Sequence, residues 1–578
     1  MIRNTLLPVS LLPPELLARV FHFYAVADPP WHGVTKLGWI QVTHVCRHWR
    51  QVALDHASLW ARISGFPMCT KWITEQLSRA KNSPLEIELL GNPTPETISL
   101  FPSHLHHTRK LRLRGLSRSH LSAIKELWSL EAPDLEHLEL VVSPSKVANP
   151  LTSQDFDGVW LFQGKAPKLR TLSLCHIRVP WLFFPRCQFT QLKIVLSEEE
   201  WNEPPSSLGS LGHLVSVLAN CPNLEVLALE FCLPSMLSRS IHMRNVHLPR
   251  LSYLSLAGST PRVVRFFESL NLPSSTKLNL HCIVGDPFGN EGSLLIPLVF
   301  SHFNHPTLVT FRSFKIALNH LDRSLEINAS TTAPLSATSP SDVFDNGPDG
   351  SLTELSLSFI SHSEFRQLEN ILERACSVLP IAELKFLSVA VPDLPHSLNW
   401  EELLRRCGKV ATIEACGRGT TSLLQAITPS KPPNKSKGKK KGRGKRDVPS
   451  QAVDTPPMCP LIFPQLKSLL LKGFDFSELV PQIGNAYDVL VMAIQRRKNR
   501  KKPLKMLSID RSILCQRHAT ALEKLVREFY WSGEEAKSFD EYDFDDFDHY
   551  SYYDHDYHGD DVPRLEDYFH GTTQAEWE

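Results

Sequence analysis

The chain has 578 residues, 42% of them hydrophobic, and its 62 basic and 61 acidic residues leave a formal net charge of +1. This length exceeds one ordinary hydrophobic core, so we expect several domains or one long repeat array. The balanced charge excludes a generally basic nucleic-acid binder and an acidic mimic of a polyanion.

The cysteines and the apolar segments bear on the compartment. Twelve cysteines are scattered singly without a C-x-x-C pair, which argues against zinc ribbons and thioredoxin-type redox sites and is typical of buried thiols in a reducing compartment. The N-terminus is interrupted by Pro8, Pro13, Pro14 and Glu15, unlike a signal peptide. No run of about 18 apolar residues predicts a spanning helix. We therefore expect a cytoplasmic or nuclear protein without a membrane segment.

The first predicted helix lies in the stretch LLPPELLARVFHFYAV, residues 11–26. Pro13 and Pro14 suit the first turn, where a backbone N–H has no helical partner, and Glu15 suits the positive end of the helix dipole. The residues that follow predict an apolar stripe: Leu16, Leu17, Val20, Phe21 and Tyr24.

A second helix is predicted in residues 41–60. Its apolar residues recur with helical spacing, at Val42, Val45, Cys46, Trp49, Val52 and Ala53. We expect Asp55 to cap a short third helix that carries Leu59 and Trp60. Three helices in roughly fifty residues make a unit too small to be very stable alone, so we expect it to pack on a larger body or on a partner.

The order and spacing of these residues resemble the F-box. The resemblance rests on Leu12, Pro13, Glu15, Leu16, Leu17, Val20, Phe21, Val45, Cys46, Trp49, Leu59 and Trp60. Residues 61–91 also resemble F-box-like proteins expanded in mushroom-forming fungi, through Trp72, Leu77 to Arg79, and Pro84-Leu85. The first inter-helix loop, with Pro29, Pro30 and Trp31, is longer than usual in the family. The alternative is that the helices only cap a larger core.

The resemblance implies a fold and a partner for the N-terminal region. It implies a helical F-box over residues 8–64 that binds a Skp-family adaptor through the twelve residues named above. Through the adaptor, it implies a link to a cullin and its RING ubiquitin ligase. We expect residues 65–130 to hold a linker helix and the first strands.

The body contains one recurrent pattern, Leu-x-x-Leu-x-Leu, here called the leucine frame. It recurs fully or in most positions at residues 132–140, 166–174, 221–229, 248–256, 349–357, 381–389, 463–471 and 502–509. Such a frame is typical of the strand of a leucine-rich repeat, in which alternate leucines enter a stacked core. We thus expect Leu227 and Leu254 inside and Glu225 and Ser252 outside.

The predicted fold class is α/β: a three-helix F-box followed by an irregular leucine-rich-repeat solenoid, or horseshoe. Degenerate repeats are expected over residues 131–428 and 459–530, with helical stretches such as 211–220, 364–379 and 399–408 between strands. The spacing between frames is uneven, often well above the 20–29 residues of regular repeats. The alternative is an α/β domain with parallel strands and coincidental leucines.

Three segments lack the composition of a core. Residues 329–350 are rich in Ser, Thr, Pro and Gly and predict a flexible insertion, and residues 429–458 contain a dense basic run. The basic run is compatible with a nuclear localisation signal, a phosphate or RNA contact, or a solvated loop. It has no aromatic residue to stack on bases, so sequence-specific nucleic-acid binding is not supported.

The C-terminal residues 531–578 are predicted to be a disordered acidic, aromatic tail, which could lie on the basic run or on basic partners. Its histidines, His549, His555 and His558, have no fixed scaffold, so we expect no selective metal site.

No catalytic motif stands out. P-loop, nucleophile-elbow, H-E-x-x-H and dinucleotide motifs are missing, and His104, His106 and His107 are expected in an exposed loop. We expect no enzyme, cofactor or metal. Our hypothesis is that the protein is a substrate receptor that holds an unknown target protein for ubiquitination. The alternatives are a leucine-rich scaffold that never meets a ligase, and a nucleic-acid-associated protein acting through the basic run.

Overall fold

The computed structural model describes residues 9, 12–29, 37–65, 70–91, 93–143, 160–184, 188–197, 209–234, 245–285, 291–303, 310–332, 353–362, 364–392, 398–427, 461–477, 479–480 and 484–533. The chain forms two compact units, and the boundary between their described parts lies between Phe189 and Thr190. The predicted basic insertion, 429–458, and residues 534–578 of the predicted acidic tail lie outside the described residues. The tail is predicted to begin at residue 531, but Trp531 is the last residue of the strand Glu528–Trp531.

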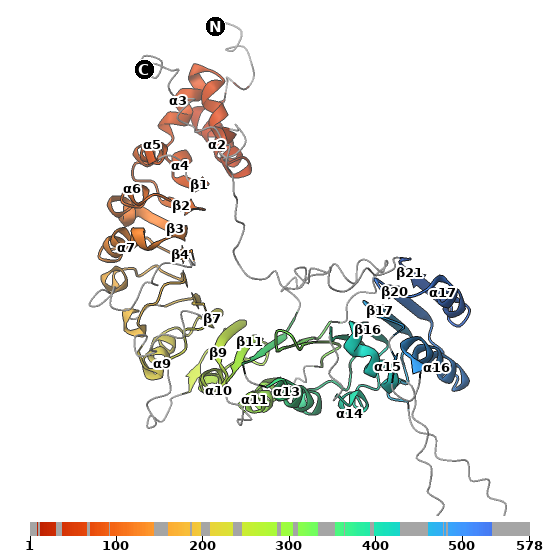
Figure 1. The fold of residues 1–578 in the computed structure, drawn as a ribbon. Coiled ribbons are helices and arrows are strands. Elements are labelled where there is room, and N and C mark those ends of the chain that lie inside the picture. Colours follow the sequence, from red (N-terminus) through yellow and green to blue (C-terminus); the bar gives the residue numbers. More distant parts are fainter. Residues whose placement is uncertain are drawn as a thin grey trace, which may run out of the picture. The chain divides into compact units, whose positions relative to one another are not determined.

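The first unit begins with helices and continues into a parallel sheet. Its N-terminal elements are α2 (Pro14–Ala27), the 3-10 helix η2 (Gly38–His44), α3 (Arg47–Asp55) and α4 (Ala57–Trp60). The strands pair in chain order: β1 (Arg62–Gly65), β2 (Leu85–Leu89), β3 (Thr108–Leu116), β4 (His137–Val142) and β5 (Thr171–Cys175). The helices α5 (Thr70–Ala80), α6 (Pro95–Ile98) and α7 (Leu121–Trp128) lie on one side of these strands (Figure 1).

The continuous helix predicted through Val42 to Ala53 is wrong. The 3-10 segment ends at His44, and Cys46, with an extended backbone of φ −161° and ψ 166°, serves as the N-cap of α3. Its sulfur accepts a hydrogen bond from the Trp49 backbone N–H at 3.5 Å. Asp55 does not cap α4, whose N-cap is His56. The Asp55 carboxylate instead accepts a bond from the Gln51 side-chain amide within α3.

The second unit also contains a sheet that is mostly parallel. In spatial order, its first strands are β6 (Gln191–Val195), β7 (Val226–Glu230), β9 (Tyr253–Ser259), β11 (Lys277–Val284) and β14 (Leu355–Ser361), all parallel. Its last strands, also parallel, are β15 (Phe386–Ala390), β16 (Thr412–Cys416), β17 (Ser468–Lys472), β20 (Met506–Asp510) and β21 (Glu528–Trp531).

An antiparallel hairpin separates these two groups of strands. It consists of β12 (Ser313–Asn319) and β13 (Ser324–Ser330), and β13 runs antiparallel to both β12 and β14. The outer side of β12 pairs in parallel with β15. Because β13 extends to Ser330, the first two residues of the predicted flexible insertion belong to a strand. Its remainder from residue 333 lies outside the described residues.

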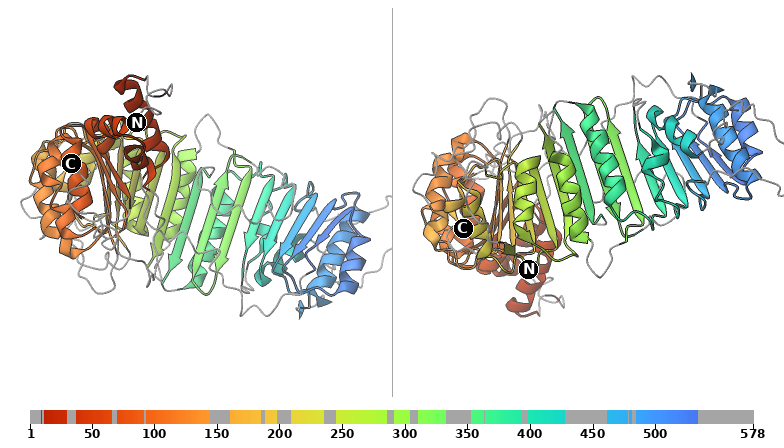
Figure 2. Two further views of the ribbon diagram at one scale, coloured as in Figure 1. Left: turned by 90° about the horizontal axis from the view of Figure 1, so that it is seen from above. Right: turned by 90° about the horizontal axis from the view of Figure 1, so that it is seen from below.

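Helices cover one side of the second sheet. Figure 2 shows its strands in one view and, in the opposite view, the helices packed behind them. The helices are α9 (Leu211–Ala219), α10 (Thr260–Glu268), α11 (Glu291–Phe303), α13 (Phe365–Val378), α14 (Trp400–Leu403), α15 (Thr421–Ile427), α16 (Ala486–Asn499) and α17 (Gln516–Glu523). The predicted helices in 211–220 and 364–379 are thereby confirmed, whereas in 399–408 the helix covers only Trp400–Leu403.

The leucine frames explain the core. All eight coincide with strands, namely β4, β5, β7, β9, β14, β15, β17 and β20. Leu227 and Leu254 are 0% exposed, whereas Glu225 and Ser252 are exposed, as predicted. Alternate side chains of a strand point to opposite faces, so one face is sealed by helices and the other, here called the open face, displays the intervening residues. This mostly parallel arrangement is consistent with a repeat solenoid.

Candidate functional site

One face of α2 presents apolar side chains that nothing in the described structure covers. Leu16 is 50% exposed, Val20 53% and Phe23 65%. Their spacing of four and three residues places them in one line along the helix. Leu17, Ala18 and Phe21 on the other face are buried. Both faces of α2 are therefore apolar, which is more than a helix that only packs on its own core requires.

The twelve residues that resemble the F-box fall into two groups. The accessible ones are Leu12, Pro13, Glu15, Leu16, Val20 and Val45, together with the half-buried Cys46 and Trp49. Leu17, Phe21, Leu59 and Trp60 are at most 2% exposed and form the interior of the helical unit. These four act through packing, and direct contact of the others with an adaptor stays a prediction.

Aromatic packing holds the helices together. The Trp49 ring lies 5.1 Å from that of Phe21, which joins α3 to α2. The buried Trp60 ring lies 5.1 Å from Trp39 and 6.1 Å from Trp72. Its indole N–H donates to the Ala53 carbonyl at 2.8 Å. The sequence pattern missed Trp39, because it lies in a 3-10 segment without helical periodicity.

The tryptophan cluster continues into the parallel sheet. The Arg79 guanidinium of α5 lies 4.6 Å from the centroid of the Trp60 ring, a cation–π contact, and forms an ion pair with Glu75 at 2.6 Å. Strand β1 follows α4 after one residue and pairs with β2 from Arg62 onward. The helices are thus fixed to the first strand of the sheet without a linker.

A glycine closes the base of the loop between the first two helical elements. Gly38 has a φ of 55°, and a β-carbon placed there would lie 2.7 Å from the Asp28 carbonyl oxygen. That carbonyl accepts the Trp39 backbone N–H at 2.8 Å. Only glycine permits this conformation and close approach. Residues 30–36 of this loop lie outside the described part of the chain.

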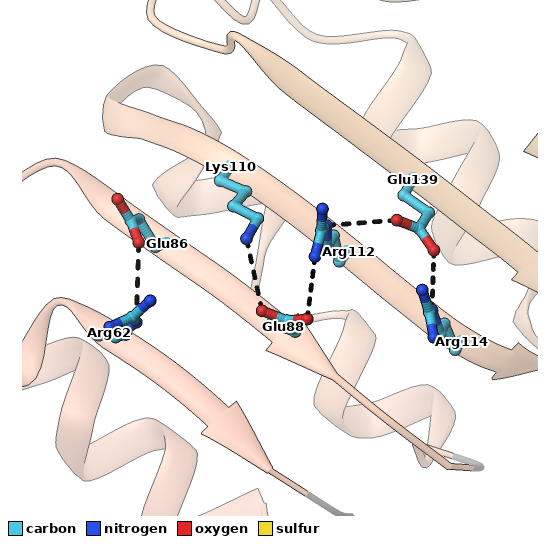
Figure 3. A network of polar contacts seen from close by, with 7 residues as sticks. All are labelled: Arg62, Glu86, Glu88, Lys110, Arg112, Arg114 and Glu139. Carbon is cyan, nitrogen blue, oxygen red and sulfur yellow. Dashed lines mark hydrogen bonds and ion pairs between the residues drawn. The ribbon is translucent and has the colours of Figure 1, made fainter. Parts of the chain in front are cut away.

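The open face of the first sheet carries a ladder of ion pairs (Figure 3). Glu88 lies 3.4 Å from Lys110 and 3.2 Å from Arg112, and Glu139 lies 3.2 Å from Arg112 and 2.7 Å from Arg114. Burial alone favours the neutral form of Glu88, but the charges of Lys110 and Arg112 and the hydrogen bonds they donate outweigh it and lower the pKa of Glu88.

On the open face of the second sheet, hydrogen bonds of hydroxyl, amide and imidazole groups connect β7, β9, β11 and β14. The Ser255 hydroxyl donates to the Glu230 carboxylate at 2.9 Å, and the Asn279 amide donates to the Ser255 oxygen at 3.2 Å. A His281 ring nitrogen lies 3.0 Å from the Ser358 hydroxyl oxygen. In this part of the face, hydroxyl, amide and imidazole groups thus take the place of the cations of the first unit.

The histidine cluster is structural. His104, His106 and His107 belong to the 3-10 helix η3 (Pro102–His107), not to a loop, and His107 is only 7% exposed. Its Nδ1 lies 2.8 Å from the Ser83 carbonyl oxygen, and its Nε2 lies 3.2 Å from His104 Nδ1. Burial and then the neighbouring histidines lower the pKa of His104. The exposed loop predicted here is wrong.

Burial favours the neutral thiol form of four cysteines. Burial raises the pKa of the Cys232, Cys282 and Cys376 thiols, and raises that of Cys407 to about 12. A thiol held in its neutral form is a poor nucleophile and a poor metal ligand. Within the described residues, no group of three His, Cys, Asp or Glu side chains could hold a metal ion. None of the helices in that part is long and apolar enough to cross a membrane.

Comparison with known proteins places the N-terminal region. No curated protein matches the chain. The family model F-box-like matches residues 9–65, from just before α2 to the end of β1. Proteins of this family are typically non-catalytic adaptors, and the domain implies binding of a Skp-type adaptor. Residues 9–65 of this chain are an F-box-like domain.

Proposed function

We propose that the chain is the substrate-receptor subunit of an SCF-type cullin-RING ubiquitin ligase. The F-box-like domain binds a Skp-family adaptor, and through it a cullin, while the body holds a target protein. The observation that carries the proposal is the exposed line of Leu16, Val20 and Phe23 on α2, inside the matched domain. Apolar side chains lined up in this way are typical anchors of a protein interface.

The direct connection to the sheet supports the same role. β1 follows α4 after one residue and Trp60 packs on Trp72 of α5, so the helices and the first strands are joined by direct packing. A receptor gains from such packing, since it fixes the distance between a held target and a ubiquitin-charged enzyme. Catalysis then comes from proximity supplied by the complex.

The open faces of the sheets are the proposed surface for the target. Their outward residues are constrained by neither helix packing nor the leucine interior. The polar ladder of Glu88, Arg112 and Glu139 offers directional groups that a partner with complementary charges would have to match.

The double substitution Pro13→Ala and Leu16→Ala tests the adaptor contact. Both side chains are exposed in α2 or at its N-cap, so we expect adaptor affinity to fall by at least about 2 kcal/mol without loss of fold. Titration calorimetry with a purified Skp-type adaptor measures this. Leu321→Ala, at a residue 78% exposed in the second unit, is the matched control and should bind normally.

Trp49→Ala should weaken both binding and the helical unit, because Trp49 is half-buried and packs on Phe21. Normal capture of the adaptor by the double mutant would contradict the assigned surface. If the wild-type protein captured neither adaptor nor cullin, the ligase role would be contradicted. The alternative, a leucine-rich scaffold that never meets a ligase, would then be favoured.

A further inference from the structure

A dense group of cations lies where α16 ends and β20 begins. Residues 495–527 contain eleven lysines and arginines against two acidic residues. The last turn of α16 holds Arg496, Arg497 and Lys498, and Arg500, Lys501 and Lys502 follow directly. Lys498, Lys501, Lys502 and Lys505 are exposed. Cations suit the negative end of a helix dipole, but one or two would satisfy it.

The cations continue along the edge at which the strands of the second sheet begin. The Lys505 backbone N–H donates to the Lys467 carbonyl, Lys467 to Ala411, Ala411 to Lys385, and Lys385 to Arg312, all at 2.8–2.9 Å. Neighbouring strands lie about 4.8 Å apart, so this row is compact. We call the exposed cations of this surface the basic edge: Arg312, Lys385, Lys467, Lys498, Lys501, Lys502 and Lys505.

The local structure holds these cations in place. Arg497 is fully buried, and its Nη2 donates to the carbonyl oxygens of Phe463 at 2.8 Å and Leu466 at 3.3 Å, which attaches the end of α16 to the segment before β17. Lys501 adopts a φ of 59°, a left-handed conformation that favours glycine and is strained for a lysine. The chain keeps a cation where local geometry prefers another residue.

The basic edge differs from the cations of the ion-pair ladder in the first unit, because no described acidic residue forms an ion pair with it. There, Lys110, Arg112 and Arg114 all form ion pairs with glutamates. Among the described residues, no ion pair involves a member of the basic edge. Burial lowers the pKa of Arg497 to about 10, so at neutral pH it stays charged and adds to the positive potential of this region.

We infer that the basic edge is the docking surface for the acidic C-terminal tail of the same chain, residues 539–561. This segment has ten acidic residues and no lysine or arginine, and aromatic residues separate its acidic groups. Its sign and density of charge complement the seven cations of the basic edge. Docking of the tail shields this surface from polyanions.

The length of the chain permits this contact. The described residues end at Gly533, two residues beyond β21, whose first residue donates its N–H to the Lys505 carbonyl at 2.9 Å. A four-residue strand spans roughly 13 Å, and the five residues from 534 to 538 span up to about 17 Å when extended. The chain is therefore long enough for the tail to reach back to the basic edge. A short tether of this kind gives an effective concentration on the order of millimolar.

Carbodiimide coupling in the full-length monomer tests the contact, because it links only carboxylates and amines that already touch. We expect links from the aspartates of 539–561 to Lys467, Lys498, Lys501, Lys502 or Lys505 in low salt, and their loss at about 1 M salt. The triple variant K498Q/K501Q/K502Q should lose most of them. The matched variant K71Q/K81Q/K168Q, at exposed lysines of the first unit, should keep them. Links to the lysines of 431–445 instead, or links only between two copies in an isotope-mixed sample, would overturn the inference.

Heparin binding gives a second readout. Replacing Asp543, Asp545, Asp546 and Asp548 by Asn in the full chain keeps the tail but weakens its charge. We expect heparin affinity to rise by about tenfold at roughly 0.1 M salt, and the rise to vanish when K498Q/K501Q/K502Q is added. Unchanged heparin affinity, or a rise that survives the lysine substitutions, would show that the tail does not cover the basic edge.

Discussion

Glu88 of the first unit and Glu414 of the second occupy the same place in their strands. Each lies between two core residues, Ile87 and Leu89 in one case and Ile413 and Ala415 in the other, and each faces the open side. Glu88 is paired with two cations and its pKa is lowered. Burial raises the pKa of Glu414, and the Ser388 hydrogen bond and the charges of Lys315 and Lys472 only partly oppose this.

The opposite pKa shifts of Glu88 and Glu414 come from the residues beside them on the neighbouring strands. The direct neighbour of Glu88 on β3 is Arg112, whereas those of Glu414 are Ser388 on β15 and Leu470 on β17. One scaffold thus gives the same carboxylate opposite electrostatic surroundings. The buried residues determine the strand, and the outward residues of adjacent strands determine its chemistry.

Both units share an interior of buried leucines. Substitutions in this interior should lower stability more than any other change considered below. Leu254→Ala or Leu227→Ala should lower the free energy of unfolding by about 2–5 kcal/mol, because both side chains are 0% exposed. Glu225→Ala or Ser252→Ala should change it by no more than about 0.5 kcal/mol. Hydrogen exchange of peptides from β7 and β9 measures the effect locally. Similar losses from both classes would mean that the strand orientation is wrong.

The ion-pair ladder should matter next. Glu139 is 16% exposed and bridges Arg112 and Arg114, so Glu139→Gln should destabilise the first unit by about 1–3 kcal/mol and leave Arg114 without its partner in the ladder. Exchange rates of peptides from β3 and β4 measure this at neutral pH. The second unit serves as the internal control, and its peptides should be unaffected.

Glu414→Gln should have the opposite sign. The substitution keeps the shape and removes a charge whose burial is unfavourable, so the second unit should gain about 1 kcal/mol at neutral pH. Slower exchange in β15 and β16 would show the gain. A loss of stability would mean that Lys315 and Lys472 compensate the buried charge fully.

Mild acid should change the local stability of the two units in opposite directions, and this is the smallest of the expected effects. The pKa of Glu88 is lower in the folded protein than the value of 4.5 expected in the unfolded chain, so its ionised form stabilises the fold above pH 4.5. This stabilisation is lost as the pH falls below 4.5 and through the folded pKa. The raised pKa of Glu414 is unfavourable at neutral pH, and this effect is relieved as pH falls from its folded value towards 4.5. Acidification towards 4.5 should therefore slow exchange around β16 first. Loss around β2 should follow only below 4.5.

The sequence predicted the common interior better than the strand order. Strands β6, β12 and β16 follow the same spacing with other apolar residues, and a pattern restricted to leucine missed them. An example is Phe311, just before β12, with Phe314 and Ile316 inside β12. The antiparallel position of β13 has no local signal, because it depends on which distant strand its edges meet. Pairing between β11 and β14 joins residues such as His281 and Ser358, 77 positions apart.

The candidate site shows a similar division. The apolar line of Leu16 and Val20 followed from helical spacing, and Phe23 extends it by the same rule. The break at Cys46 did not follow, since an extended N-cap interrupts a pattern whose apolar spacing alone suits a continuous helix. Burial of Leu17 and Phe21 could not be separated from exposure of Leu16 and Val20, because both faces of α2 are apolar.

The ends of β13 and β14 have a consequence for how the chain tolerates change. The Glu354 carboxylate accepts the Thr331 N–H at 2.9 Å and its hydroxyl at 2.7 Å, next to the paired residues Ala329 and Leu355. The segment between them starts and finishes at one fixed point on the sheet. Doubling its length costs only about 0.6 kcal/mol in loop-closure entropy. We therefore expect insertions between β13 and β14 to be tolerated, whether they arise in evolution or by engineering. A peptide tag or a small domain placed there should leave the strand register unchanged.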